Sequence, residues 1–283
     1  MNSLTPTPHL DILLDLALAE DIGTGDVTTR SVISSTQLGA MVIEARQQLT
    51  FCGAPVAERL IQRFGDLSLS VEWFVQEGEQ VGAGHKVGQL KGRLESILVI
   101  ERPLLNFLQR MSGVATLTRS YVDAIAGTGA RIVDTRKTMP GFRLLDKYAT
   151  RTGGASNHRS ALDGGVLIKD NHLQAAGGVA SAVRKARAHA SHSLAIEVEV
   201  EDLAGLDAAL EAGADVVLLD NFTAEGVAQA VQRAGGRAIM EASGGIVLEN
   251  VRAYAETGVD LIAIGALTHS ARAVDLAGEV TGV

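Results

Sequence analysis

The stretch LAIEVEVEDLAGLDAALEAGADVVLLD, residues 194–220, contains two short apolar runs with a helical pattern between them. Leu194–Val200 and Asp215–Leu219 are rich in β-branched and aliphatic residues, which is typical of buried strands. The segment between them has the spacing of an amphipathic helix and carries a glycine near its end, a common helix terminator. A strand, a helix and a second strand in this order predict a βαβ unit in a parallel sheet.

Four further apolar runs extend this pattern along the second half of the chain. They are Arg131–Val133, Gly165–Ile168, Ala238–Met240 and Asp260–Ile264, and helical patterns such as VASAVRKARAHA (179–190) separate most of them. Repeats of similar length favour a closed or nearly closed β/α barrel over an open doubly wound sheet. No G-x-G-x-x-G motif follows a strand, which argues further against a dinucleotide-binding fold.

The first hundred residues have a different pattern. A helix is predicted over His9–Ala19, where leucines recur on one face. Alternating segments with glycine turns follow, as in LSVEWFVQEGEQVGAGHKVGQLKG (69–92), and they predict an antiparallel sheet. A helix from Ile100 to about Val122 is expected to connect this part to the barrel. We therefore expect one domain over residues 1–112 and a second over residues 113–283.

The composition excludes several classes of protein. A formal net charge of -8 argues against a nucleic-acid partner, which requires a basic face. The longest apolar runs are too short to cross a membrane, and the N-terminus has no signal-like core. A single cysteine, Cys52, excludes an intramolecular disulfide and a cysteine-cluster zinc site. The expected location is the cytoplasm.

Polar side chains follow or fill the predicted barrel strands. The polar segments are Asp134–Lys137, Lys169–His172, Asp220–Asn221 and Glu241–Gly245, while Glu197 and Glu199 lie within the third strand and Gly265 follows the sixth. In a β/α barrel the carboxyl ends of the strands form the face that carries the active site. The sequence therefore predicts a site at this edge.

The charges at this edge fall into two groups. The cationic group contains Arg136, Lys137, Arg159 and Lys169, with His158 and His172; the anionic group contains Glu199, Asp220 and either Glu197 or Glu241. Cations clustered in an acidic protein suit a multiply anionic ligand, such as a phosphate or a carboxylate. Carboxylates beside them suit sugar hydroxyls, Mg²⁺ or a developing positive charge. Because residues two apart share a strand face, Glu197 and Glu199 point the same way, and a structural ion pair inside the barrel remains open for Glu197.

Several motifs in a fixed order resemble one enzyme family. They are EDIGTGDVTT (20–29), ERPLLNFLQRMSG (101–113), DTRKTMPGFRLLDKYATRTGGASNHR (134–159), LIKDNH (167–172), EVEVE (197–201), LLDNF (218–222), EASGGI (241–246) and TGVDLIAIGALTHS (257–270). Together they span nearly the whole chain and resemble the quinolinate phosphoribosyltransferases, also called nicotinate-nucleotide pyrophosphorylases (carboxylating). Ala155 departs from the pattern, where the family often has a third glycine, and we expect only a modest effect on the backbone.

The resemblance implies a fold and a reaction. The fold is type II phosphoribosyltransferase-like α/β, with an N-terminal α/β sandwich domain and an incomplete C-terminal β/α barrel, and a C-terminal tail that packs back on the N-terminal domain. The reaction converts quinolinate and phosphoribosyl pyrophosphate into nicotinate mononucleotide, CO₂ and pyrophosphate with Mg²⁺, a step of NAD biosynthesis. The family also implies a homodimer whose sites lie at the subunit interface.

The resemblance assigns roles to individual residues. Arg136, His158, Arg159 and Lys169 meet the quinolinate carboxylates, with Arg102 donated across the dimer interface. Lys137 and Lys169 lie near the phosphoribosyl groups, and Glu199 and Asp220 face the ribose hydroxyls and Mg²⁺, directly or through substrate or water. The expected catalytic residues are Lys137, Lys169, Glu199 and Asp220. The remaining predicted substrate-binding residues are Thr135, Ser243, Gly244, Gly245, Ala263, Ile264, Gly265 and His269.

Three alternatives to this function remain. A related phosphoribosyltransferase that uses nicotinate or another base would need fewer cations than this edge supplies. The homologue associated with molybdenum transport resembles this chain around DTRKT, but the NHR and LIKDNH motifs favour the transferase. A non-catalytic barrel would bind phosphoribosyl pyrophosphate without turnover, and the presence of Lys137, Lys169, Glu199 and Asp220 argues against it.

Overall fold

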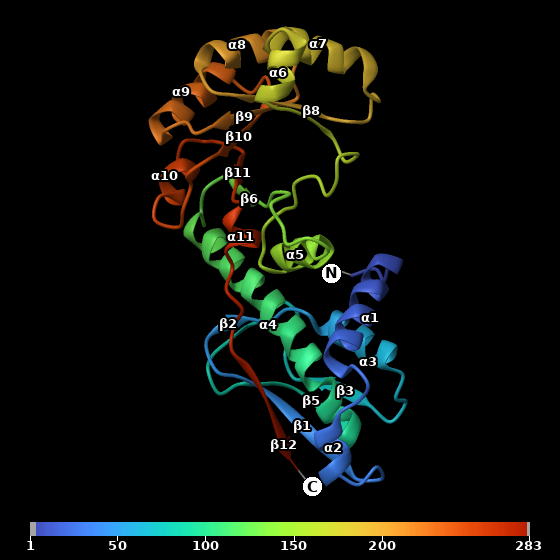
Figure 1. Ribbon diagram of the computed structural model, residues 1–283. Helices are drawn as coiled ribbons and strands as arrows, with labels where there is room; N and C mark the ends of the chain where they lie inside the picture. Colours follow the sequence, from blue (N-terminus) through green and yellow to red (C-terminus); the bar gives the residue numbers. More distant parts are fainter. Residues whose placement is uncertain (1–3, 282–283) are drawn as a thin grey trace. The chain divides into compact units, whose positions relative to one another are not determined.

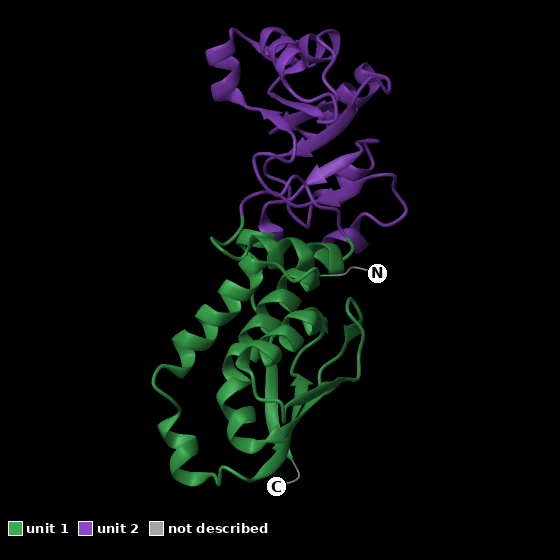
Figure 2. Ribbon diagram, turned by 90° about the vertical axis from the view of Figure 1, so that its right-hand side faces the viewer, with its two compact units in different colours: residues 1–119, 138–154, 268–283 green, residues 120–137, 155–267 purple. Residues whose placement is uncertain are grey.

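The computed structural model describes residues 4–281, which form two compact units (Figure 2). Unit 1 contains residues 1–119, 138–154 and 268–283, and unit 2 contains residues 120–137 and 155–267. The chain therefore passes between the units more than once. No helix among residues 4–281 has both the length and the apolar content needed to span a membrane.

Unit 1 is built on an antiparallel sheet. Its strand order is β12 (Leu276–Thr281), β1 (Leu38–Ala45), β5 (Lys86–Arg93) and β3 (Ser70–Trp73), and β2 (Leu49–Thr50) pairs with β4 (Gln80–Val81). The helices of this unit are α1 (Pro8–Ile22), α2 (Val27–Val32), α3 (Ala54–Phe64), α4 (Leu94–Ala124, whose last residues belong to unit 2) and α5 (Arg143–Thr152). The predicted helices over 9–19 and 100–122 are confirmed and lie within α1 and α4.

The local sequence explains where α1 begins and which face it buries. Thr7 caps the helix, because its hydroxyl accepts a hydrogen bond from the Leu10 backbone N–H at 3.2 Å. Pro8 occupies the first turn, where a missing N–H costs nothing. Leu10, Leu14 and Leu18 recur at helical spacing and are buried in the core of unit 1.

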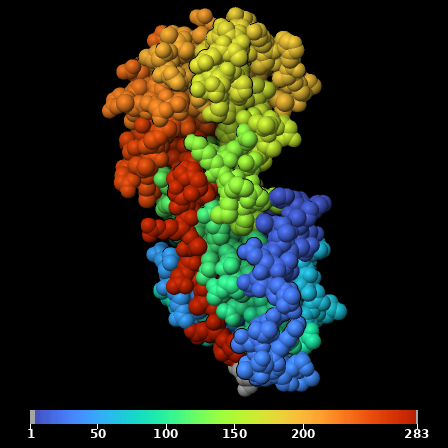
Figure 3. All heavy atoms as spheres, viewed as in Figure 1, coloured from blue at the N-terminus to red at the C-terminus, as the bar shows by residue number. Residues whose placement is uncertain are grey.

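The C-terminal segment belongs to the same unit as the N-terminal strands. It runs along α4 (Figure 3), where the Val274 N–H donates to the Gln109 carbonyl at 3.1 Å and the Gln109 side chain donates to the Leu276 carbonyl at 2.8 Å. Strand β12 then pairs with β1 from Leu276 opposite Ala45 to Thr281 opposite Ala40. Residues separated by more than 230 positions thus complete one sheet.

Gly113 allows α4 to approach this C-terminal segment closely. A Cβ atom at this buried position would lie 2.1 Å from the Arg272 carbonyl oxygen. We expect Gly113→Ala to lower the free energy of unfolding by about 1–3 kcal/mol through overpacking, as measured by urea denaturation. Gly129→Ala is the control, because Gly129 is exposed with no atom within 4 Å of an added Cβ. Equal stability of the two variants would contradict this account of the close approach.

Unit 2 is a six-stranded parallel sheet (Figure 1). Its strand order is β6 (Arg131–Val133), β11 (Leu261–Ala263), β10 (Ile239–Ser243), β9 (Val216–Asp220), β8 (Ile196–Val200) and β7 (Val166–Ile168). Its helices are α6 (Asp170–Ala176), α7 (Val179–His189), α8 (Leu203–Glu211), α9 (Ala224–Ala234) and α10 (Val251–Ala255). The short helix α11 (Ala266–His269) begins in unit 2 and ends in unit 1. All six strands predicted from the apolar runs are confirmed. Strands β6 and β7 end the order without pairing to each other in the described chain, so the barrel is incomplete.

Candidate active site

The carboxyl ends of the unit 2 strands surround a cavity of about 290 Å³ that is lined by both charged and apolar side chains. Its lining residues are Thr135, Arg136, Lys137, His158, Arg159, Leu167, Lys169, Glu199, Leu218, Asp220, Glu241, Ser243 and Ala263. The predicted strand-end charges therefore lie around one cavity, because parallel strands place their carboxyl ends at one edge of the sheet.

Some predicted site residues lie outside this lining. Gly244 and Gly245 directly follow the lining residue Ser243, and Gly265 follows Ala263 by two positions. Ile264 is buried, and its N–H donates to the Val133 carbonyl at 2.9 Å, so its backbone serves the sheet.

Three more of the residues singled out from the sequence lie elsewhere. Arg102 and His269 are exposed residues of unit 1 and are not among the lining residues. His172 caps α6, because its Nδ1 accepts a hydrogen bond from the Lys169 N–H at 3.0 Å. The sequence analysis grouped His172 with the cations of the site. In the structure its ring instead caps α6 and does not line the cavity.

Three lining residues were not assigned a substrate contact from the sequence, although Glu241 was an alternative to Glu197 in the anionic group. Leu167 lies two positions before Lys169, Leu218 two before Asp220, and Glu241 two before Ser243. Residues two apart on a strand share a face, so this spacing would have identified all three as a deeper layer of the cavity. The register agrees, because Leu218 lies opposite both Glu199 and Glu241 on its two neighbouring strands.

Asp134 joins the two motifs DTRK and NHR. Its side chain is fully buried, and its two carboxylate oxygens accept hydrogen bonds from the His158 N–H at 2.8 Å and the Asn157 side chain at 2.7 Å. A buried carboxylate that receives two donors is well satisfied. Asp134 therefore holds the segment 157–159 against the end of β6 and brings Arg159 to the wall that carries Arg136.

Arg159 is arranged to receive an anion. Burial, together with the neighbouring charge of Arg136, lowers the pKa of Arg159, and the opposing charge of Glu197 offsets part of this effect. One guanidinium nitrogen donates to the Gly165 carbonyl at 2.8 Å, while the buried Nε has no hydrogen-bond partner among the described residues. Two neighbouring guanidinium groups that repel each other gain most from a ligand carrying negative charge.

Lys169 and Glu199 form an ion pair on the other side of the cavity. The lysine side chain is half exposed, whereas Glu199 is largely buried. The period of two on β8 is confirmed in part: Glu197 and Glu199 both face inward, but Glu199 pairs with Lys169 and Glu197 pairs with His158. The two glutamates take different partners because Glu199 lies nearer the carboxyl end of β8 than Glu197 does.

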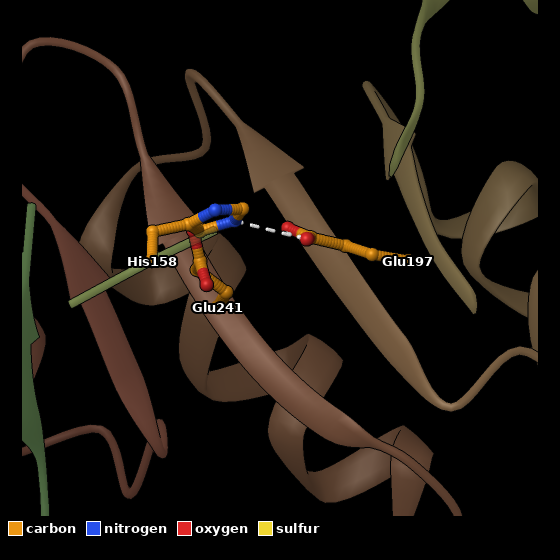
Figure 4. Close-up of side chains that lie close together, drawn as sticks. All are labelled: His158, Glu197 and Glu241. Carbon is orange, nitrogen blue, oxygen red and sulfur yellow. Dashed lines mark hydrogen bonds and ion pairs between the residues drawn. The ribbon is translucent and has the colours of Figure 1, made fainter. Parts of the chain in front are cut away.

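Figure 4 shows the His158 imidazole beside the carboxylates of Glu197 and Glu241, both of which are buried. The Nε2 atom of His158 lies 3.0 Å from a Glu197 oxygen and 3.9 Å from a Glu241 oxygen. The Arg159 backbone N–H donates to His158 Nδ1 at 2.7 Å, so the neutral imidazole carries its proton on Nε2 and donates it to Glu197. Both ring nitrogens of His158 therefore form hydrogen bonds within the protein.

Glu241 occupies the least solvated position of this cluster. Burial, and after it the negative charge of Glu197, raise its pKa to about 8, although the charges of His158 and Lys169 act in the opposite direction. One oxygen of each carboxylate has no hydrogen-bond partner in the described chain. One possible ligand atom from each of His158, Glu197 and Glu241 lies within 4.8 Å of the other two. However, the Nε2 atom of His158 carries the proton that it donates to Glu197, so this nitrogen has no lone pair for a metal ion. The cluster therefore suits a shared proton better than a metal ion.

The whole chain resembles known proteins. The family model for the C-terminal domain of quinolinate phosphoribosyl transferase matches residues 114–278, and the model for the N-terminal domain matches residues 26–112. The chain belongs to the quinolinate phosphoribosyltransferase family.

Relatives of this family match over nearly their full length. The probable nicotinate-nucleotide pyrophosphorylase [carboxylating] of Bacillus subtilis is 39% identical over 96% of this chain and 94% of its own. The corresponding protein of Mycobacterium leprae is 42% identical over 92% and 93%. The structure of the nicotinate-nucleotide pyrophosphorylase from Francisella tularensis has a TM-score of 0.94, 40% sequence identity and 99% coverage of both chains. The predicted fold class is thereby confirmed.

Proposed function

We propose that the protein transfers the phosphoribosyl group of phosphoribosyl pyrophosphate to quinolinate, with release of CO₂ and pyrophosphate and formation of nicotinate mononucleotide. One observation carries this proposal: a single cavity has two neighbouring guanidinium groups on one wall, and Lys169, Glu199 and Asp220 around the rest. A dicarboxylate base requires the guanidinium wall, and a phosphorylated sugar requires a cation for its phosphate and carboxylates for its hydroxyls. Relatives that span the whole chain carry names of this activity.

Quinolinate is proposed to bind against Arg136 and Arg159. Planar guanidinium groups bind carboxylates through two parallel hydrogen bonds, which a lysine cannot do. The Nε of Arg159, which has no hydrogen-bond partner within the described part of the chain, supports this assignment. His158 is proposed to shape this wall rather than to donate a proton to substrate, since Arg159 and Glu197 engage both of its ring nitrogens.

The phosphoribosyl group is proposed to lie toward Lys137, Lys169 and the Ser243–Gly245 turn. Gly244 and Gly245 have φ values of 95° and 63°, a backbone conformation that suits successive N–H groups pointing at a phosphate. Glu199 and Asp220 would accept hydrogen bonds from the ribose hydroxyls. Thr135 and Ala263 complete the lining of the cavity.

Mg²⁺ is proposed as the cofactor, with Glu199 and Asp220 as the residues that would hold it, directly or through substrate or water. Both are oxygen donors on one cavity, which suits a hard cation. Lys169 occupies one oxygen of Glu199, so that residue has one oxygen left for another ligand. When bound, Mg²⁺ supplies neutralisation of the pyrophosphate that leaves.

The reaction then needs two steps. In the first, the ribose–pyrophosphate bond breaks and the pyridine nitrogen bonds to the sugar carbon, through an oxocarbenium-like state that nearby carboxylates stabilise. In the second, the bond from C2 to its carboxylate breaks, CO₂ leaves, and the electron pair remains on C2 next to the positive ring nitrogen until a proton is taken up. The chain's cations hold the substrate in place during both steps.

The direct test is an assay with quinolinate, phosphoribosyl pyrophosphate and Mg²⁺. We expect nicotinate mononucleotide, CO₂ and pyrophosphate in equal amounts. Nicotinate in place of quinolinate is the control and should react poorly, because it has one carboxylate fewer. A preference for nicotinate would favour a different phosphoribosyltransferase. Binding without turnover would favour a non-catalytic barrel.

We further propose a homodimer in which Arg102 completes the partner's site. Its exposed position on α4 in unit 1 is compatible with this role. Arg102→Ala and Lys169→Ala proteins are expected to be nearly inactive alone. Because a mixed dimer would contain one intact site, random mixing should restore about a quarter of wild-type activity.

A matched mixture controls this complementation. Arg136→Ala combined with Lys169→Ala should remain inactive, because both residues line the same cavity and every site of the mixed dimer carries one substitution. Equal behaviour of the two mixtures would show that Arg102 does not act across an interface. We also propose a cytoplasmic location, which rests only on the single cysteine of the chain.

A further inference from the structure

Asn221 has an unusual backbone conformation directly beside the cavity. It follows Asp220 at the end of β9, and it is the only non-glycine residue between 4 and 281 with a positive φ, at 57°. This left-handed region is sterically unfavourable for most residues and is tolerated best by glycine, with asparagine next. A position where glycine would be easier but asparagine is present indicates a use for the side chain.

The side chain of Asn221 contacts Asp220. Its Nδ2 atom donates a hydrogen bond to the Asp220 Oδ2 atom at 2.7 Å. In an extended strand, neighbouring side chains point to opposite faces and do not meet. The left-handed turn at residue 221 therefore brings the amide back to the carboxylate that precedes it.

Asn221 is also packed against the turn that follows β10. Its backbone N–H donates to the Ser243 carbonyl at 2.8 Å. A Cβ atom at Gly244 would lie 2.2 Å from the Asn221 Oδ1 atom and 2.9 Å from the Asn221 backbone nitrogen. Gly244 has a φ of 95°, so both its conformation and its contact with Asn221 require glycine.

These contacts connect two parts of the cavity that lie on neighbouring strands. We propose that Asn221 is a positioning residue, which holds the Asp220 carboxylate in a fixed orientation relative to the Ser243–Gly245 turn. This inference rests on the proposed function, in which Asp220 meets the ribose and the turn meets its phosphate. The hydroxyls and the phosphate of one ribose phosphate would then be bound at a fixed distance from each other. The affinity for this part of the substrate would therefore depend on Asn221.

The sharpest variant is Asn221→Gly. Glycine adopts the same backbone conformation without steric cost and removes only the amide. We expect its melting temperature to equal or exceed that of the wild type, while the affinity for phosphoribosyl pyrophosphate falls about tenfold, as for loss of a hydrogen bond to a charged group. Isothermal titration with Mg²⁺ but without quinolinate measures this affinity, and the absence of the acceptor base excludes turnover.

A second variant separates the amide from the backbone. Asn221→Ala also removes the amide but retains the unfavourable conformation, so its melting temperature should fall while its affinity matches that of Asn221→Gly. Quinolinate is the matched ligand, because the proposed quinolinate wall contains Arg136 and Arg159, whereas Asn221 contacts Asp220 and the turn after β10. Its affinity should stay within twofold of the wild-type value in both variants.

The outcomes separate this inference from the proposed function. If wild-type protein binds phosphoribosyl pyrophosphate and Asn221→Gly binds it equally well, Asn221 is only a turn residue and the inference is wrong. The inference is also wrong if Asn221→Gly loses affinity for both ligands together with its melting temperature, since that pattern reports a general loss of structure. If wild-type protein does not bind phosphoribosyl pyrophosphate at all, the proposed function fails and the inference fails with it.

Discussion

Replacing Arg159 by alanine is expected to lower kcat/KM for quinolinate at least about thirtyfold. Removing one partner from a desolvated carboxylate contact costs roughly 2–5 kcal/mol, and about 1.4 kcal/mol corresponds to a factor of ten. Arg159 is well placed for such a contact, because its buried Nε has no hydrogen-bond partner among residues 4–281 and Arg136 lies close enough to lower its pKa. Steady-state kinetics with varied quinolinate measures the effect.

Two further variants sharpen this prediction. Arg159→Lys keeps the charge but loses the planar fork, so its kcat/KM should lie between those of the alanine variant and the wild type. Arg187→Ala is the control from the same unit: Arg187 forms an exposed ion pair with Asp215, before the start of β9 and outside the cavity lining. If Arg159→Ala and Arg187→Ala have the same kcat/KM for quinolinate, Arg159 does not take part in quinolinate binding.

Glu241→Gln is expected to remove a large pH dependence of stability. The folded-state pKa of Glu241 is about 8, against an ordinary value of 4.5, because burial and Glu197 disfavour its charge. Between these values the folded protein keeps a proton that the unfolded chain has lost. The free energy of unfolding therefore falls as the pH rises, by up to about 1.4 kcal/mol per pH unit for this group.

Glutamine has the shape of the protonated acid and does not titrate. We expect the variant to be close to the wild type in stability near pH 5 and clearly more stable near pH 9, as measured by urea denaturation across this range. Glu211→Gln, on an exposed position of α8, should retain the wild-type slope. An unchanged slope in Glu241→Gln would show that Glu241 is ionised in the folded protein throughout.

Local sequence patterns predicted the six strands of unit 2 and some of the helices between them, such as α7 and α8. Each apolar run between 131 and 264 became a strand, because β-branched residues in short blocks suit a sheet covered on both faces. The helices between them follow the spacing of their apolar residues, and α8 begins where Asp202 accepts a hydrogen bond from the Gly205 N–H at 2.7 Å. These choices depend on residues within a few positions of one another.

The cavity was predicted as a location rather than as a set of contacts. Strand ends share one edge in any parallel sheet, so the positions of Arg136, Lys169 and Asp220 at this edge followed from the strands alone. The hydrogen-bond partners of the charged side chains did not follow from the strands. Asp134 was grouped with the strand-end charges, but it is buried and binds the backbone and side chain of residues more than 20 positions away.

The sequence by itself determined the order of elements, the edge of the sheet that carries charge, and the family. Period and composition encode these properties locally, and many motifs in a fixed order identify a family. Only the tertiary structure decided that β12 joins β1, that Glu197 and Glu199 take different partners, and that burial raises the pKa of Glu241. The physical reason is that burial and hydrogen-bond partners depend on distances between segments remote in the chain, and a linear pattern contains no such distances.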